Sequence, residues 1–363
     1  MNGSTWRLSW HGVRTVAALE LRQRVRSTRW MVALVVWFVV VGAITAITTG
    51  ALGTLTGGAT SPVHRGPLLF FVVTFLVLGL GLLVTPTLSS TAVNGDRAAG
   101  TLATVQVTLL TPAEIATGKL LGAFAAATAF LVASLPFYGL AMAMGGTSVL
   151  TLVSVVVVTA VILASVCGMG IGFSALTART AGSTVLTFLG VAGLAVFTLV
   201  FFGLTLPANT SQEQVRVWGT EPSAALASDA TPSVTSPGCQ WRVETRPVVH
   251  TERTWWLLAA NPFVVVADAS AVPRQELPSV TSPFAAIRDE IRTARAGATG
   301  VSNECWGPQG QQALPTGTAQ PSTRPVWPWG LGFTVLLGGA GYVVAVRRLR
   351  IPQRTLPRGV RVA

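Results

Sequence analysis

Charged residues are scarce in this sequence. They make up 10% of its 363 residues, while 50% are hydrophobic and the mean hydropathy is +0.59. Soluble globular domains carry roughly 25% charged residues. Intrinsic disorder is excluded as well, because disordered chains are poor in apolar residues. The class that remains is a membrane protein with several spans.

Acidic residues are even scarcer than basic ones. The chain has 25 Lys and Arg against 13 Asp and Glu, which gives a formal net charge of +12. Such a balance is typical of nucleic-acid-binding proteins. Those proteins need a large hydrated surface to carry their basic residues, and so apolar a chain does not have one. We therefore expect no nucleic-acid partner.

Six apolar runs contain no Asp, Glu, Lys, Arg or His, and each is long enough to form a membrane span. They are residues 30–49, 67–92, 120–144, 150–176, 183–206 and 326–346. A helix needs about 20 residues to cross the hydrocarbon layer. The sequence therefore predicts an all-α polytopic membrane protein with six transmembrane helices, five of them within 30–206 and the sixth at 326–346.

The basic residues predict the orientation of these spans. Six Arg lie in segment 1–29 and six more in the tail 347–363. Arg and Lys near span ends are enriched on the cytoplasmic side. We therefore expect cytoplasmic N and C termini and an extracytoplasmic domain of mixed character at 207–325, between the fifth and sixth spans. One Lys among 25 basic residues is typical of a GC-rich bacterial genome, so we expect a bacterial cytoplasmic membrane.

The first 29 residues have the pattern of an amphipathic cytoplasmic arm. Trp6, Trp10 and three further apolar residues recur at helical spacing, and Arg22 and Arg26 lie beside them. This pattern is typical of a helix that lies in the membrane interface, with Trp at the acyl boundary and Arg at anionic headgroups. The alternative is a basic flank without a fixed helix.

The domain at 207–325 contains one strongly apolar segment, residues 254–272. Asn261-Pro262 interrupts it and Asp268 lies in its second half. A seventh span here would move the Arg-rich tail to the outside. We interpret the segment as an interfacial or partly re-entrant helix pair, and a buried helix of the outer domain is the alternative.

Two of the three cysteines, Cys239 and Cys305, fall in the same outer domain. Cysteines that share an extracytoplasmic domain usually pair, so we expect a disulfide, with two free thiols as the alternative. Cys167 lies inside the fourth predicted span and is expected to be a small core residue.

The predicted spans lack the groups that chemistry within a membrane requires. Proton-coupled transporters and membrane-embedded hydrolases keep acids or histidines there, and these spans have none. The three histidines are scattered over both sides, so we expect no metal site. Around Gly118-Lys119 the flanking Ala113 and Leu120 break the phosphate-binding loop pattern. The chain is therefore expected to bind no cofactor and not to be an enzyme.

The predicted cytoplasmic loop 93–119 contains a strong helix-start pattern. Thr111 and Glu114 have capping-box spacing, and Pro112 occupies the first helical position. We expect one helix to end near Leu110 and a new helix to begin at Pro112 and continue into the third span. Such an element is suited to transmitting a mechanical displacement to the spans. The alternative is an ordinary loop followed by a well-capped helix.

This loop resembles the membrane subunits of type-2 ATP-binding-cassette (ABC) transporters. The family places an acidic-Arg pair, Gly-Thr-Leu, a Leu-Leu pair followed by Pro, and Gly-Lys-Leu between its second and third spans. The matching residues here are Asp96-Arg97, Gly100-Thr101-Leu102, Leu109-Leu110-Thr111-Pro112 and Gly118-Lys119-Leu120. The segments Glu20-Leu21-Arg22-Gln23-Arg24 and Asn261-Pro262-Phe263 are also similar to the family. Ala103 departs from the family's usual acidic residue, and two additional residues precede the Leu-Leu pair.

The resemblance implies the permease subunit of an ABC exporter. It would form a homodimer or heterodimer with a second permease subunit and bind separate ATPase subunits, which would hold ATP and Mg. The ATPase-coupling residues would be Asp96, Arg97, Gly100, Thr101, Pro112 and Glu114. The alternative is a non-transporting membrane scaffold or receptor whose extracytoplasmic domain binds a partner. Lipids, drugs, peptides and polysaccharides are all open as substrates.

Overall fold

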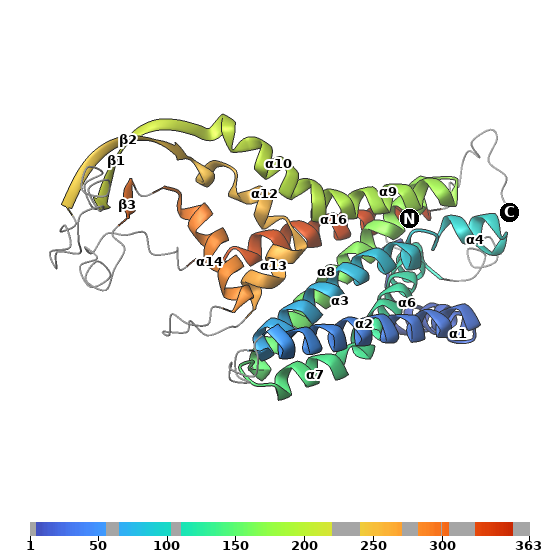
Figure 1. Cartoon of the computed structure of the whole chain (residues 1–363). Helices are drawn as coiled ribbons and strands as arrows, with labels where there is room; N and C mark the ends of the chain where they lie inside the picture. The colour runs from blue at the N-terminus through green and yellow to red at the C-terminus, as the bar shows by residue number, and fades with distance from the viewer. Residues whose placement is uncertain are drawn as a thin grey trace.

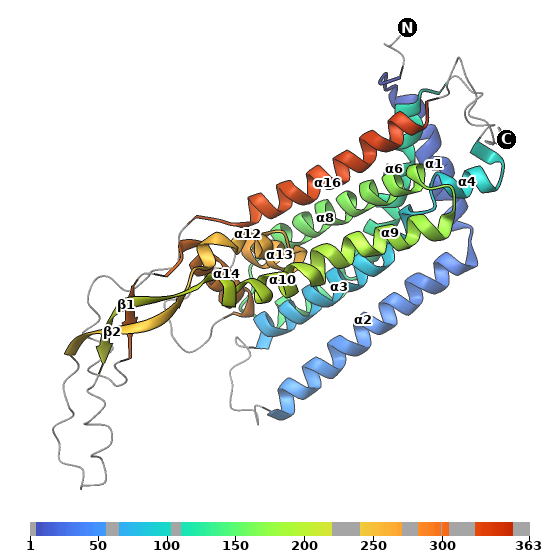
Figure 2. The same cartoon turned by 90° about the horizontal axis from the view of Figure 1, so that it is seen from above.

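The computed structural model describes residues 5–55, 65–102, 110–219, 240–270, 282–298, 300–304 and 324–350. The described part is mostly helical, and six of its helical segments are long and apolar enough to cross a membrane. These segments run side by side in one bundle, and a small sheet lies beyond one end of the bundle (Figures 1 and 2). The prediction of six long apolar helices is confirmed.

The six segments follow the predicted runs closely. They are α2 (Thr28–Leu55), α3 (Arg65–Ser89), α6 (Pro112–Ala133) with α7 (Leu135–Ala143), α8 (Val149–Leu176), α9 (Thr180–Ala192) with α10 (Thr198–Thr205), and α16 (Trp327–Arg348). The fifth segment contains a π-helical turn, η2 (Gly193–Phe197), between α9 and α10. The third breaks at Ser134, with Pro136 in the first turn of α7.

The first helix and the last helix meet at the same end of the bundle. We call this end, which carries α1 (Trp10–Val25) and α4 (Asn94–Ala98), the arm end, and the opposite end the sheet end (Figure 2). Leu349, just past α16, is buried at the arm end in one apolar cluster with Val93 and Ile115. Because the number of spans is even, the start of the first span and the end of the last span lie at the same end of the bundle.

Glycines set the distance between α8 and α16, the two helices that lie against each other along the bundle. A Cβ added at Gly168 would lie 2.5 Å from the carbonyl oxygen of Gly338, and one at Gly172 would lie 2.5 Å from Cα of Gly341. Small residues allow helix backbones to approach closely in a membrane. Gly168 and Gly172 therefore form the face of α8 that packs on α16.

Helix α2 lies at the edge of the bundle, and most of its surface is exposed. Only Trp37, Val41 and Thr45 are buried among its described side chains. The indole N–H of Trp37 donates to Oγ of Ser134 at 2.9 Å, at the break between α6 and α7. This bond fixes α2 near its middle and leaves a groove toward the arm end.

A three-stranded sheet lies beyond the sheet end. It consists of β1 (Thr210–Gly219), β2 (Gln240–Val249) and β3 (Val301–Asn303), in the order β2-β1-β3. β1 pairs antiparallel with β2, with Trp218 opposite Trp241, and parallel with β3. Short 3₁₀ turns, η3 (Pro207–Asn209) and η4 (Thr251–Arg253), connect the sheet to the helices.

Residues 254–270 of the predicted segment 254–272 form two short helices, α12 (Trp255–Ala259) and α13 (Pro262–Ala269), separated at Asn261, and residues 271–272 lie outside the described part. The side-chain amide of Asn261 donates to the Ala195 carbonyl at 2.9 Å, in the π-helical turn of the fifth span. Val266 of α13 is fully buried in the bundle core, whereas Trp256 of α12 is exposed. The helix pair therefore covers the sheet end of the bundle.

Asp268 connects the helices of the sheet end. Its carboxylate accepts the backbone N–H groups of Val326 and Trp327 at 2.6 and 2.7 Å, at the start of α16. It also accepts Nε of Arg292 at 2.6 Å, from α14 (Pro283–Ala296). The side chain of Asp268 is completely buried. A carboxylate at a helix N-terminus satisfies free N–H groups there, so Asp268 fixes α13 and α14 to the sixth segment.

Candidate functional site

The arm helix α1 lies across α6 at the arm end. A Cβ added at Gly118 would lie 2.5 Å from Cβ of Val16, and one at Gly122 would lie 2.7 Å from Cβ of Glu20. These two glycines, one helical turn apart, therefore permit the close crossing. Ser9 is the N-cap residue of α1, and its Oγ accepts the backbone N–H of Gly12 at 3.1 Å.

Glu114 connects the start of α1 to the start of α6. Its Oε1 accepts the backbone N–H of Ser9 at 2.8 Å, and its Oε2 accepts that of Thr111 at 2.7 Å. Oγ1 of Thr111 accepts the Glu114 N–H at 3.2 Å and donates to the Arg7 carbonyl at 2.6 Å. The predicted capping box is therefore present, and α6 begins at Pro112 as predicted.

Lys119 is the only lysine in the chain, and its ammonium group joins three helices. Nζ lies 2.6 Å from Oε1 of Glu20 on α1 and 2.5 Å from Oδ2 of Asp96 on α4. The Lys119 side chain is 3% exposed, compared with 13% for Glu20 and 34% for Asp96. A buried ammonium needs charged partners to offset its lost hydration, so the two carboxylates hold α1 and α4 against α6.

Asn94, the first residue of α4, connects this helix to the next pair of spans. Its Nδ2 donates to Oγ of Ser183 on α9 at 2.7 Å. Its backbone N–H donates to Oγ of Ser174 on α8 at 3.1 Å, and Ser174 donates back to Oδ1 of Asn94 at 3.0 Å. The short helix α4 is therefore bonded to α8 and α9 through Asn94 and to α6 through Asp96, and α1 shares the same lysine through Glu20.

The predicted coupling residues differ in exposure. Gly100 and Thr101 are exposed just after α4, and Gly100 has φ +71°, a conformation that favours glycine. Asp96, Arg97 and Pro112 are half-buried, whereas Glu114 is buried. Residues 103–109, including the Leu109 of the family motif, lie outside the described part of the chain. The exposed members of the predicted set are therefore Gly100 and Thr101, which lie in an exposed tip at 98–101.

Two contacts of this site were not predicted from the sequence: the ion pair of Lys119 with Glu20 and the hydrogen bond of Asn94 to Ser183. Both arise from packing between distant segments of the chain. One indication was available for Lys119. It is a single lysine among 24 arginines, beside a glycine, at the start of an apolar run. Lysine in such a position is compact enough to be enclosed between helices.

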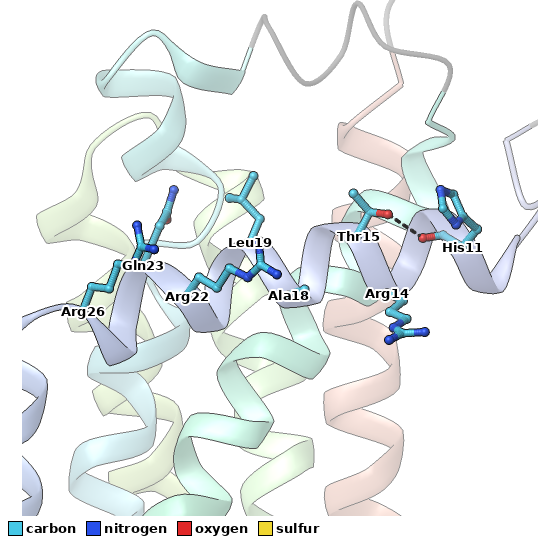
Figure 3. A pocket seen from close by; sticks show the side chains of 8 residues that line it. All are labelled: His11, Arg14, Thr15, Ala18, Leu19, Arg22, Gln23 and Arg26. Atoms are coloured by element: carbon cyan, nitrogen blue, oxygen red, sulfur yellow. Dashed lines mark hydrogen bonds between the residues drawn. The ribbon is translucent and has the colours of Figure 1, made fainter.

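The outward face of α1 is basic. His11, Arg14, Arg22 and Arg26 line a shallow hollow along it, and Figure 3 shows α1 crossing the bundle helices with these side chains on it. Trp6 precedes α1 rather than belonging to its apolar face, because the helix begins after Ser9. Trp10 is 75% exposed. The face that packs on α6 therefore carries Val13 and Val16 but no tryptophan.

A polar cluster at the sheet end contains a serine, a histidine and two glutamates. Nε2 of His250 lies 2.8 Å from Oγ of Ser211 and 3.0 Å from Oε1 of Glu213, and Nδ1 lies 2.7 Å from Oε1 of Glu252. A carboxylate faces each ring nitrogen, and Ser211 donates to Glu213 at 3.1 Å. His250 directly follows β2, so the cluster joins β1, the end of β2 and η4.

Cys239 and Cys305 lie outside the described residues, so their pairing stays a prediction. Their described neighbours are Gln240, which begins β2, and Glu304, which follows β3. Cys167 is a buried free thiol on α8, as its apolar neighbours predict. Within the described residues, no group of three or more His, Cys, Asp or Glu is placed to hold a metal ion.

No family model matches the chain, and no curated protein matches it either. At the arm end, the described residues form an internally bonded unit of α1, α4 and the start of α6. Its exposed parts are the tip at 98–101 and the basic face of α1.

Proposed function

We propose that the chain is the membrane subunit of an ABC-type exporter in a bacterial cytoplasmic membrane. It would act as a dimer, with a second permease subunit and separate ATPase subunits that bind ATP and Mg. The observation that carries this proposal is the connection of an exposed tip to several spans. The tip at 98–101 follows directly on α4, and α4 is bonded to α6 through Asp96 and to α8 and α9 through Asn94.

The order of the loop motifs supports the same proposal. Asp96-Arg97, Gly100-Thr101-Leu102 and Gly118-Lys119-Leu120 follow one another as in the family that the loop resembles. In this proposal an ATPase subunit pushes on the tip when it closes on ATP. Helix α4 passes the displacement to α6 through the Asp96–Lys119 pair and to α9 through Asn94. Glu20 makes α1 follow the same movement because it shares Lys119 with Asp96.

The charge distribution supports a cytoplasmic arm end. By chain order alone, six membrane spans assign fifteen basic and three acidic residues to the arm side and ten of each to the sheet side. The whole net charge of +12 is therefore on the arm side. Basic residues near span ends favour the cytoplasmic side, which is also where ATP is available.

The test is purification of the tagged chain from its source membranes, followed by identification of bound proteins and measurement of ATP hydrolysis. The proposal predicts a co-purifying ABC ATPase and vanadate-sensitive hydrolysis. The pair Arg97→Glu and Thr101→Arg should remove both, since it reverses the charge of Arg97 beside the tip and adds bulk at Thr101 within the tip. Glu290→Lys, an exposed change at the sheet end, is the matched control and should remove neither.

Two results contradict the proposal. One is a chain that purifies intact without any ATPase, which is what the scaffold or receptor alternative predicts. The other is an ATPase whose binding and hydrolysis are the same in the tip variant and in the wild type.

A further inference from the structure

A groove with an apolar wall and a basic head lies between α2 and the rest of the bundle. Its walls come from α2 and α3, with Ala33, Val36 and Val40 facing Leu80 and Val84. Val36 is 53% exposed and Val40 36% exposed, so the α2 wall is open to the surroundings of the bundle.

Aromatic rings form the floor of the groove. Trp30 and Trp37 both pack on Phe130 of α6, with ring centroids 4.9 and 5.0 Å apart. The Trp37 ring is held in place by its bond to Ser134. The floor and both walls are therefore apolar over about half the length of α2.

The head of the groove lies at the arm end and is polar and basic. It contains Arg24, Arg29, Gln23 and Ser27, which come from the end of α1 and the start of α2, and Thr87 and Thr91 near the end of α3. Within this head, the described residues include no Asp or Glu that lines the groove.

One guanidinium nitrogen of Arg24, Nη1, has no hydrogen-bond acceptor among the described residues. Its Nη2 donates to the Leu88 carbonyl at 3.0 Å and lies 3.7 Å from Oε2 of Glu20. Nη1 itself is buried. The Arg24 side chain is 19% exposed and lines the head of the groove, where its guanidinium charge faces the groove lining.

We propose that this groove binds one anionic phospholipid, with its phosphate at Arg24 and Arg29 and one acyl chain along Val36, Val40 and Val84. The charge of the head selects an anionic headgroup, because guanidinium groups bind phosphate strongly. The apolar walls select an acyl chain rather than a free phosphate. The lipid would fill the space between α2 and α3 and so hold α2 against the bundle. This inference rests on the membrane location of the chain and is independent of transport.

Native mass spectrometry of the purified full-length protein in detergent tests the proposal, with dioleoyl phosphatidylglycerol as the probe. The wild type should retain one phosphatidylglycerol more tightly than dioleoyl phosphatidylcholine. Arg29→Gln should weaken that binding by about tenfold, which corresponds to the loss of one charged hydrogen bond. The matched control is Arg14→Gln, an exposed α1 arginine outside this groove, which should leave the binding unchanged.

A second variant tests the acyl-chain wall without changing any charge. Ala33→Trp should fill the groove beside Trp37 and lower phosphatidylglycerol retention, while the thermal stability of the protein stays near that of the wild type. Glycerol 3-phosphate at millimolar concentration should not displace the lipid, because it has no chain to occupy the walls.

Any of four results overturns the proposal. Equal loss of lipid in Arg14→Gln and Arg29→Gln would indicate nonspecific charge attraction. Equal retention of the two lipids would remove the role of the basic head. Displacement by glycerol 3-phosphate would indicate a site for a free phosphate. Disulfide-linked dimers of Val36→Cys that form regardless of added lipid would show that a second copy covers the groove.

Discussion

Nζ of Lys119 lies 2.6 Å from Oε1 of Glu20, although 99 residues separate them in the chain. The contact exists because Gly118 and Gly122, on either side of Lys119, let α1 approach α6 without interference from a Cβ. Asp96 supplies the second carboxylate. A glycine-mediated crossing and a buried ion pair thus act at the same point of the bundle.

Lys119→Met should release the arm helix. The substitution removes the close partner of Glu20 and leaves it only the longer contact with Arg24 at 3.7 Å. Breaking a largely buried pair destabilises by on the order of 3 kcal/mol. We expect a lower unfolding temperature in detergent and faster protease cleavage within α1. The control is Arg14→Met, which removes an exposed charge from the same helix.

A double-mutant cycle separates the ion pair from simple loss of packing. Lys119→Met combined with Glu20→Leu should recover part of the lost stability, because the combination removes the carboxylate that has lost its close partner. If the two effects simply add, the ion pair does not hold the arm.

The predictable features are those that depend on neighbouring residues. Apolar runs of sufficient length predict the six segments, and Thr111, Pro112 and Glu114 predict the start of α6, because a cap is made within one helical turn. The arm is a helix as expected, but Ser9 is its N-cap, so Trp6 lies before the helix. Serine is a preferred N-cap residue, so this helix start could have been predicted from the sequence.

The features that could not be predicted depend on distant packing. The strands β1, β2 and β3 pair across long intervening segments that carry no strand pattern. The contact between Glu304 and Arg246, beside this sheet, joins residues 58 positions apart. The exposed or buried state of Asp96 and Glu114 depends on where α1 lies, which their own neighbours in the chain do not determine.

Stability of the sheet should depend on Glu304 at acidic pH. Hydrogen bonds from the Arg246 guanidinium hold the pKa of Glu304 below its ordinary value. A carboxylate with a lowered pKa in the folded state stabilises that state above its unfolded pKa, near 4.3. This contribution is lost as the pH falls through the lowered value.

The measurement is thermal unfolding followed by tryptophan fluorescence, since Trp218 and Trp241 lie opposite each other on the sheet with ring centroids 5.2 Å apart. The wild type should unfold at a higher temperature than Glu304→Gln at pH 7, and this difference should shrink toward pH 3. A difference that stays constant over this range contradicts the role of the Glu304 charge.

The two outer cysteines should be oxidised in protein isolated under non-reducing conditions. Cys239 and Cys305 fall in the predicted extracytoplasmic domain, where disulfides persist. Alkylation of the unreduced, unfolded chain should label one thiol, Cys167, and alkylation after reduction should label three. Labelling of all three thiols before reduction contradicts the pairing.

Gly338→Ala should weaken the contact between α8 and α16. The new Cβ would lie 2.6 Å from Cα and from the carbonyl oxygen of Ser165, both of which are backbone atoms that cannot rotate away. The helices must separate, and overpacking of this kind costs about 1–3 kcal/mol. The expected result is a lower unfolding temperature in detergent.

The adjacent glycine provides a matched control, because a Cβ added at Gly339 meets nothing within 4 Å. Alanine is the better helix former by about 1 kcal/mol, so Gly339→Ala should leave the unfolding temperature unchanged or raise it. Both substitutions add the same methyl group one position apart on α16, and only one of them faces α8. Equal effects of the two variants would therefore mean that the close approach of Gly338 to Ser165 does not stabilise the bundle.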